Sequence, residues 1–390
     1  MKTIRDFDLN NKTVILRCDL NVPFKDNEIL DDTRIVSSIE TIKYILDNNA
    51  RVIILSHLGK VKNEDDKKNN SLSLVIDRLN SLLDGRIEFV PYTKSDIILE
   101  KVSNLSFGHG ILLENTRFED LNGKLESSCD LSLAKYWASL GDIFINDAFG
   151  TIHRGHASNL GVSTYLESGI GFLVEKELSF LNKLDDPKRP FAVIMGGAKI
   201  SDKLKIIDSF IERVDYLFIG GAMAYTFLKA LGYSIGDSLY EEDYLDYCKK
   251  LYAKYSDKII LTKDVCGSFS FSNDTDKFCY DIDNIPSGFQ GLDIGAETIS
   301  LYKSKLSLVK TVFWNGPLGV YEFSNYREGT KSILDFITSN VETTILGGGD
   351  MVGAANELGY LSSVSFASTG GGATLEYLEN KDLPGLKNIE

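Results

Sequence analysis

Glycine-rich turns follow several short apolar runs in the second half of the chain, and each turn leads into a segment with helical spacing. The turns are Gly196-Gly197, Gly220-Gly221, Gly347-Gly348-Gly349 and Gly370-Gly371-Gly372. Glycine lets the backbone approach a ligand closely, and free N–H groups at the start of a helix favour phosphate. One such turn is usually only a tight strand-to-helix connection. Four of them at strand ends in one domain indicate a nucleotide-binding crevice.

Charged residues accompany these turns. Lys199 and Lys203 are four residues apart, which predicts one shared helix face where a bound phosphate would relieve their repulsion. A solvated lysine-rich face explains them equally well. Asp350 follows three glycines and could be a helix N-cap or a Mg²⁺ ligand, and Glu322 follows the turn 314–319 at a distance suited to a ribose hydroxyl. No turn matches the G-x-x-x-x-G-K-[ST] or G-x-G-x-x-G fingerprint, so neither is assigned.

Apolar runs in the first half end instead in polar and cationic residues. These residues, with one arginine at the start of a predicted helix, are Arg17, Asp19, Asn21, Arg34, His57, Lys60, Arg117, His153 and Arg154. Arginine's fork matches carboxylate and phosphate, and histidine adds a titratable donor. Each residue alone would be a surface ion-pair partner or a structural histidine. Of the 4 histidines, however, only His109 lies outside these segments, since His156 lies beside His153. The clustering indicates a pocket for a small phosphorylated acid.

Short β-branched or aromatic runs alternate with helical segments along the whole chain, which is typical of parallel α/β architecture. Strands are predicted in the first half at 13–17, 51–56, 87–90, 111–114 and 142–146. In the second half they are predicted at 191–195, 216–219, 258–262, 311–314, 343–346 and 365–367. The expected fold is therefore two Rossmann-like α/β domains, each a mostly parallel sheet flanked by helices.

A predicted helix joins the two series of strands. Residues 174–185, VEKELSFLNKLD, have helical spacing and are followed by the proline-containing segment 186–190. The expected organisation is an N-terminal domain at 1–173, this interdomain helix at 174–185 and a C-terminal domain at 186–370.

Composition excludes several classes of protein. The 390 residues suffice for two or three domains, and the net charge of −14 repels nucleic acid and anionic lipid. No run approaches the about 20 apolar residues of a membrane span, and no signal peptide is evident. The 5 cysteines are odd in number and contain no C-x-x-C pair, so all are expected to be reduced thiols of a cytoplasmic protein.

Ten segments, taken together and in this order, resemble the phosphoglycerate kinase family. They are KTVILRCDLNVPFKDNEILDDTR (12–34), SHLGKVK, LENTRF, NDAFGTIHRGHAS, GGAKISDK, GGAMAYTFL, GLDIGAETI, WNGPLGVYE, GGGD and STGGGATLEYL. The resemblance extends from about Lys12 to Gly385. It implies reversible phosphoryl transfer between 1,3-bisphosphoglycerate and ADP, with Mg²⁺ on the nucleotide, in glycolysis by a monomer whose domains close over both ligands. It also implies that the helix at 174–185 acts as a hinge and that the segment 371–390 returns to the N-terminal domain.

The resemblance also implies roles for individual residues. Those that would bind 3-phosphoglycerate are Asp19, Asn21, Arg34, His57, Lys60, Arg117 and Arg154. Those that would bind ATP or ADP are Lys203, Gly291, Glu322, Gly348, Gly349, Asp350 and Met351, with Asp350 on Mg²⁺. Those that would act on the transferring phosphoryl group are Arg34, Lys199, Gly371 and Gly372.

Four positions depart from the family pattern. Lys60 and Val61 stand where the family usually has Arg and Pro, and Ala296 replaces a common Pro. Met351 replaces a Ser or Thr and cannot supply a hydroxyl.

Two other functions fit the residues. One is a two-domain ligand-binding protein without catalytic activity, which the reduced cysteines and missing signal peptide disfavour. The other is a kinase that acts on a different acyl phosphate, because a cationic strand edge suits any close analogue of phosphoglycerate.

Overall fold

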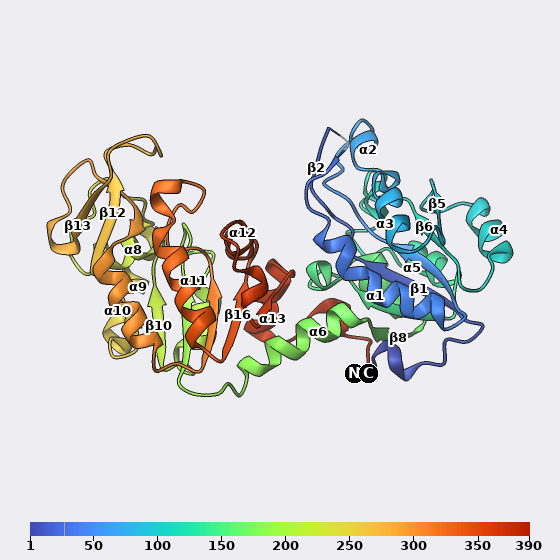
Figure 1. The fold of residues 1–390 in the computed structure, drawn as a ribbon. Helices are drawn as coiled ribbons and strands as arrows, with labels where there is room; N and C mark the ends of the chain where they lie inside the picture. Colours follow the sequence, from blue (N-terminus) through green and yellow to red (C-terminus); the bar gives the residue numbers. More distant parts are fainter. Residues whose placement is uncertain (27) are drawn as a thin grey trace. The chain divides into compact units, whose positions relative to one another are not determined.

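The computed structural model describes residues 1–26 and 28–390, which form two compact units. The first contains Met1–Ser179 and Asn380–Glu390, and the second contains Phe180–Glu379. Each unit is built around its own six-stranded sheet, in which all strand pairs are parallel (Figure 1). The predicted fold class, two mostly parallel α/β sheets flanked by helices, is confirmed.

The sheet of the first unit carries helices on both faces. Its strands, in spatial order, are β5 (Ile87–Val90), β6 (Gly110–Leu113), β4 (Arg51–Leu55), β1 (Thr13–Cys18), β7 (Ile143–Asp147) and β8 (Glu167–Ile170). Side chains alternate along the central strand. Val14 packs with α1 (Thr33–Asp47) and α3 (Ile76–Leu82), whereas Ile15 packs with α4 (Asp96–Asn104) and α5 (Leu131–Ala138). Burial on both faces explains why β1 has no exposed position.

The sheet of the second unit also carries helices on both faces, but its strands follow one another in a different order. Its strands, in spatial order, are β11 (Ile259–Ile260), β10 (Tyr216–Ile219), β9 (Phe191–Met195), β15 (Thr311–Asn315), β16 (Thr343–Gly347) and β17 (Phe366–Ala367). One face packs against α10 (Ala296–Leu306), α11 (Glu328–Asn340) and α12 (Gly349–Glu357). On the other, Phe210 of α7 (Leu204–Ile211) lies against Phe191 and Phe313. The remaining helices are α8 (Met223–Ala230), α9 (Leu245–Tyr255) and α13 (Gly372–Asn380).

All the predicted strands are present, with ends shifted by no more than two residues. The sequence did not predict β8, the β2–β3 hairpin (Phe24–Lys25 and Glu28–Ile29) or a three-stranded antiparallel sheet. That sheet has the order β13 (Phe278–Asp281), β12 (Asp264–Ser268), β14 (Gln290–Ile294) (Figure 1). Its strands are short and rich in Gly, Ser and Asp, which are weak strand formers.

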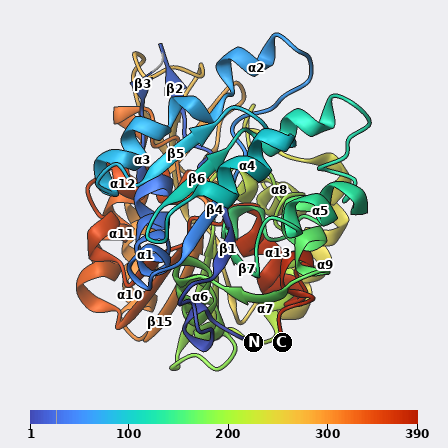
Figure 2. The same ribbon diagram turned by 90° about the vertical axis from the view of Figure 1, so that its right-hand side faces the viewer.

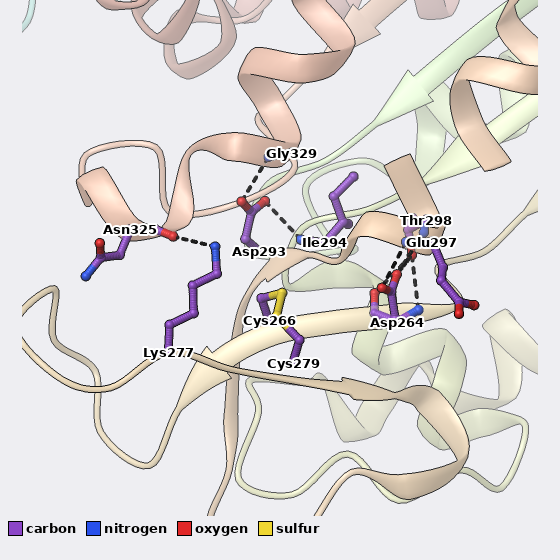
Figure 3. The surroundings of a disulfide bond; sticks show 10 residues. All are labelled: Asp264, Cys266, Lys277, Cys279, Asp293, Ile294, Glu297, Thr298, Asn325 and Gly329. Atoms are coloured by element: carbon purple, nitrogen blue, oxygen red, sulfur yellow. Dashed lines mark hydrogen bonds between the residues drawn. A yellow bond between two sulfur atoms is a disulfide. The ribbon is translucent and has the colours of Figure 1, made fainter. Parts of the chain in front are cut away.

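The expectation of reduced cysteines is wrong for two of them. Cys266 of β12 and Cys279 of β13 form a disulfide (Figure 3). They stand directly opposite each other in the antiparallel ladder, a register that could not be seen while the two strands were not predicted. Cys18, Cys129 and Cys248 are free thiols.

The predicted hinge helix is α6 (Phe172–Leu181), which begins two residues earlier than expected and continues as a 3₁₀ turn at Asn182–Leu184. Its first turn is held by buried side chains of the first unit. Thr41 Oγ1 accepts from Phe172 N at 3.0 Å, and Asp147 Oδ1 accepts from Leu173 N at 2.9 Å. No helix in the described part of the chain has both the length and the apolar character needed to cross a bilayer.

The C-terminal residues pack into the first unit. Asn146 Nδ2 donates to Gly385 O at 3.1 Å, and Gly385 N donates to Ile152 O at 2.8 Å. Lys2 N donates to Glu390 O, which agrees with the adjacent chain ends in Figures 1 and 2. Leu383 is 1% exposed, so the tail adds buried apolar surface to this unit.

Replacing Leu383 with alanine should destabilise the first unit by about 2–5 kcal/mol, because it leaves a cavity in a tightly packed region. Thermal unfolding should show a lowered midpoint for Leu383→Ala. Lys387→Ala, an exposed change in the same tail, serves as the control and should unfold like the unmodified chain. Equal midpoints for both variants would show that the tail does not contribute to the stability of this unit.

Candidate active site

The predicted acid-binding residues of the first unit lie at one edge of its sheet. Asp19 and Asn21 follow β1, His57 and Lys60 follow β4, and Arg117 follows β6. His153 and Arg154 come after β7. Because these four strands are parallel neighbours, their carboxyl ends share one edge. His109 precedes β6 and therefore lies at the opposite edge, away from this set.

Hydrogen bonds join the loops at this edge. Asp19 Oδ2 accepts from Arg34 Nη1 at 2.8 Å, and Asn21 Oδ1 accepts from Gly59 N at 2.7 Å. The Asp19 side chain is nearly buried while that of Arg34 is 36% exposed, so the carboxylate holds a guanidinium that still faces solvent. Asn21, Arg34 and Gly59 line an open cavity of about 570 Å³. This cavity is large enough for a three-carbon phosphorylated acid.

A buried network lies beneath this edge and was not predicted. Arg17, 1% exposed, donates from Nε to Ser158 Oγ at 2.9 Å. Ser158 in turn donates from its backbone N to Glu126 Oε2 at 2.9 Å. Glu126 is fully buried and supplies the counter-charge for the Arg17 guanidinium. Arg17 was recognisable as a strand-end cation, whereas Glu126 lies in a polar stretch with no pattern that would have identified it.

The same network fixes the orientation of His57. Arg17 Nη2 lies 3.3 Å from His57 Nδ1, and because a guanidinium only donates, Nδ1 must be the acceptor. The proton of the neutral ring is then on Nε2. Burial and the charges of Arg17, Arg117 and Arg34 hold the pKa of His57 well below its usual value. His57 is therefore a neutral hydrogen-bond donor rather than a general acid at neutral pH.

Positive charge is concentrated at this edge. Partial burial and the neighbouring charge of Arg154 lower the pKa of Arg117. Burial lowers the pKa of His156 to about 3, and the positive charges of Arg17, Arg117 and Arg154 contribute to this shift. Lys60 is exposed and follows Gly59 of the cavity. An anion bound here would relieve the mutual repulsion of these cations.

Glycine-rich turns of the second unit line a separate pocket. Gly197, Gly221, Gly291, Glu322 and Asp350 all contribute to its wall. A Cβ atom on Gly291 would lie 1.5 Å from Tyr225 Oη, so only glycine fits beside that ring. The predicted Gly291, Glu322 and Asp350 thus meet at one pocket, and Tyr225 is a lining residue that the sequence did not single out.

Lys203 lies beside the third glycine-rich turn. Its ammonium donates to Asn315 Oδ1, and Asn315 Nδ2 donates to Gly347 O at 2.7 Å. Burial lowers the pKa of Lys203, an effect that the negative charge of Asp350 opposes. Asn315 was not predicted as a site residue, although it stands in the WNGPLGVYE segment that carries the resemblance. It connects the lysine to the Gly347 turn.

The structure corrects the interpretation of three charged residues. Helix α7 begins only at Leu204, so Lys199 and Lys203 lie in the preceding turn and do not share a helix face. Lys199 is exposed in this turn. Helix α12 has Gly348 as its N-cap, so Asp350 lies inside the first turn and is not the cap.

Four further predicted residues lie at helix starts of this sheet edge. Met351 is fully buried in the core, so only its backbone is available to a ligand. Gly349 opens α12 and Gly372 opens α13, preceded by Gly371 with a φ of 53°. The described residues contain no group of three or more His, Cys, Asp or Glu side chains that could hold a metal by themselves.

Two parallel α/β units, one with a cationic strand edge and one with a glycine-lined pocket, form the arrangement expected of a phosphotransferase. Residues 4–381 match the family model of phosphoglycerate kinase. The chain belongs to the phosphoglycerate kinase family, which makes it a kinase with a carboxyl group as acceptor, and the resemblance seen in the sequence is confirmed. Membership of this family excludes the alternative function of a two-domain ligand-binding protein without catalytic activity.

Relatives match along their whole length. The phosphoglycerate kinase of Fusobacterium nucleatum subsp. nucleatum is 50% identical over 100% of this chain and 99% of that protein. That of Enterococcus faecalis is 51% identical over 100% of this chain and 98% of that protein. The structure of phosphoglycerate kinase from Coxiella burnetii superposes with a TM-score of 0.89 at 35% identity, over 99% of this chain and 98% of that chain.

The low pKa of His156 predicts a pH-dependent stability. The native pKa is about 3 and the unfolded value is 6.5, so below pH about 6.5 the unfolded state binds a proton that the native state does not. The free energy of unfolding should therefore decrease as the pH is lowered, by up to about 2 kcal/mol between pH 7 and pH 5. Urea unfolding should show a smaller loss in His156→Gln.

His109→Gln is the matched control, because His109 is exposed at the opposite edge of the same sheet. It should keep the full loss of stability between the two pH values. A pH dependence in His156→Gln that equals that of the unmodified chain would contradict the assigned environment of His156.

Proposed function

We propose that the chain catalyses reversible transfer of a phosphoryl group between 1,3-bisphosphoglycerate and Mg-ADP, giving 3-phosphoglycerate and Mg-ATP in glycolysis. The cationic edge of the first unit carries this proposal. It gathers Arg34, Arg117 and Arg154 in a chain whose net charge is −14. So local an excess of positive charge costs free energy in the absence of a ligand, and a small multiply charged anion offsets that cost.

Each residue of the first unit has a distinct proposed role. The arginines 117 and 154 bind the phosphate through their forks, and His57 donates from Nε2. Asp19 orients Arg34, Asn21 lines the cavity beside Gly59, and Lys60 follows Gly59 in the chain. Lys60 supplies charge without the planar fork of arginine, so its contact with substrate is a point-charge attraction.

The nucleotide is assigned to the pocket of the second unit. Gly291 leaves room for the nucleoside beside Tyr225, and Glu322 accepts from the ribose. Lys203 and the backbone of Gly348, Gly349 and Met351 face the phosphates. The exposed carboxylate of Asp350 fits Mg²⁺, an ion that proteins commonly hold by one or two carboxylates together with substrate phosphates. Such an ion would neutralise phosphate charge during transfer.

Transfer requires no general base. The attacking oxygen, from a carboxylate or a β-phosphate, is already an anion, which agrees with a neutral His57. Arg34, Lys199 and the N–H groups of Gly371 and Gly372 stabilise the charge on the transferring phosphoryl group. These residues position the reactants in line and need not exchange a proton with them.

The two ligands are assigned to different units, so transfer requires the domains to close over both and exclude water. We place the hinge at residues 174–185 and near Ser368. The proposed domains are 1–173 and 186–370, and the return to the first is placed at 380–390 because residues 371–379 belong to the second unit. The active species is proposed to be a cytoplasmic monomer without nucleic acid or membrane partners.

A coupled assay tests the substrate. Purified protein with ATP, Mg²⁺ and 3-phosphoglycerate should produce ADP, and omission of any one of the three should abolish turnover. Turnover with another carboxylic acid, but not with 3-phosphoglycerate, would instead support a kinase of a different acyl phosphate on the same fold.

Arg34→Ala should lower kcat by about 100-fold or more, because it removes a cation proposed to stabilise the transferring group. The ADP affinity measured by calorimetry should stay unchanged. Arg78→Ala is the matched control: Arg78 also pairs with an aspartate, Asp32 at 2.6 Å, and is similarly exposed. Near-normal kcat in Arg34→Ala would disprove the role given to Arg34.

Lys203→Ala should raise the Kd of ADP by about tenfold or more, the loss expected when a charge-assisted bond to phosphate is removed. The affinity for 3-phosphoglycerate should not change. Lys205, two residues on and largely exposed, supplies the control variant Lys205→Ala, which should bind ADP normally. Equal ADP affinities for the two variants would exclude Lys203 from the nucleotide site.

A further inference from the structure

The disulfide between Cys266 and Cys279 lies in the small sheet that helps to form the nucleotide pocket. We propose that this cysteine pair is a thiol–disulfide exchange site whose redox state sets the affinity of the pocket for nucleotide. The inference rests on the proposed function, because it takes the pocket of the second unit to be the nucleotide site.

The pair is accessible to a reductant from one side. Cys266 is 5% exposed in the middle strand β12, whereas Cys279 is exposed on the edge strand β13. An incoming thiolate can therefore approach the sulfur of Cys279, with Cys266 as the leaving group. Accessibility is a requirement for exchange, and a disulfide closed inside a core would not meet it.

The disulfide is directly connected to the wall of the pocket. Strand β12 pairs with β13 on one side and with β14 on the other. Cys266 stands opposite Asp293 in that second ladder, and Val265, Gly291 and Asp293 all line the pocket. Figure 3 shows Asp293 near the disulfide, with its carboxylate accepting from Ile294 N and Gly329 N at 2.9 Å each.

A second connection runs through the loop that the disulfide closes. Asn273 Oδ1 accepts from Asn325 N at 3.0 Å, and Asn325 Nδ2 donates to Asn273 O at 2.7 Å. Lys277 Nζ donates to Asn325 O at 2.8 Å (Figure 3). The rings of Phe271 and Phe323 lie 5.1 Å apart. The loop thus holds the segment that directly follows Glu322.

Besides the disulfide, strand β13 is held by its ladder with β12 and by the ring of Tyr280, which lies 5.0 Å from that of Phe289. It is four residues long, lies at the edge of its sheet, and is mostly exposed. An exposed edge strand pairs on one side only and therefore opens locally more easily than a central strand. The covalent bond therefore keeps the loop 269–278 in the conformation that contacts Asn325.

A dithiol supplies the two electrons that reduce the disulfide. One thiolate of the dithiol attacks the sulfur of Cys279, the S–S bond breaks, and Cys266 leaves as a thiolate. The second thiol of the reductant then attacks the mixed disulfide and releases Cys279. The protein gains two electrons and two protons as two thiols, and the reductant is oxidised to its own disulfide.

Reduction should weaken nucleotide binding without destroying the pocket. When β13 and its loop are released, the segment after Glu322 loses its neighbours and becomes more mobile. A nucleotide must then order this segment as it binds, and the ordering opposes binding. The first unit contains neither cysteine, so its affinity for 3-phosphoglycerate should not respond.

The test compares the full chain before and after treatment with dithiothreitol. Thiol titration of the denatured protein should give three thiols before treatment, for Cys18, Cys129 and Cys248, and five after it. Calorimetry with Mg-ADP should show a Kd that rises about five- to tenfold on reduction. The Kd of 3-phosphoglycerate should stay constant, and thermal unfolding should confirm that the reduced chain is folded.

Two variants complete the test. Cys279→Ser should bind Mg-ADP with the weaker affinity of the reduced chain and should not respond to the reductant. Cys129→Ser removes a thiol outside the pair and should keep the full response.

The proposal would be overturned if the chain still titrated five thiols after incubation with an oxidised dithiol, because the disulfide would then not form. It would also be overturned if the reduced and oxidised chains bound ADP with equal affinity. Failure of Mg-ADP to bind in either state would overturn the nucleotide assignment, and this inference with it. That outcome is distinguishable from a pocket that binds ADP equally in both states.

Discussion

Parallel pairing of strands is the constraint on which the rest of this structure depends. In a parallel sheet every strand ends at the same edge, so residues far apart in the chain meet there without any long excursion of the backbone. The first unit uses this edge for cations and histidines, and the second uses it for glycines and helix starts. Parallel sheets with different strand orders thus produce a cationic edge in one unit and a glycine-lined pocket in the other, according to the residues that follow their strands.

The cationic edge depends on a network of buried residues that lies beneath it. Arg17 is fully buried, and Glu126 compensates its charge through Ser158. This network holds His57 with Nδ1 as acceptor and Nε2 as donor, so the ring presents a proton without carrying a charge. The overall acidity of the chain therefore coexists with a local positive field, and the net charge of −14 describes the outer surface rather than the site.

Much of this could be predicted from the sequence because apolar runs and the residues that follow them are local signals. The strands of both large sheets other than β8, and the strand-end positions of His57 and Arg117, follow from such signals. The disulfide could not be predicted, because it depends on the register of two short polar strands. Glu126 and Asn315 were also not predicted as site residues, because their importance comes from contacts with residues distant in the sequence. The helix face assigned to Lys199 and Lys203 was wrong because α7 starts after both.

The central claim is that each unit binds one of the two ligands. Hydrogen–deuterium exchange of the whole chain, with 3-phosphoglycerate or Mg-ADP added separately, tests it most directly. The account predicts that 3-phosphoglycerate slows amide exchange around residues 19–21, 57–60 and 115–117. Mg-ADP should slow exchange around 196–203, 291–294 and 348–351 instead. Protection of the same unit by both ligands would contradict the account.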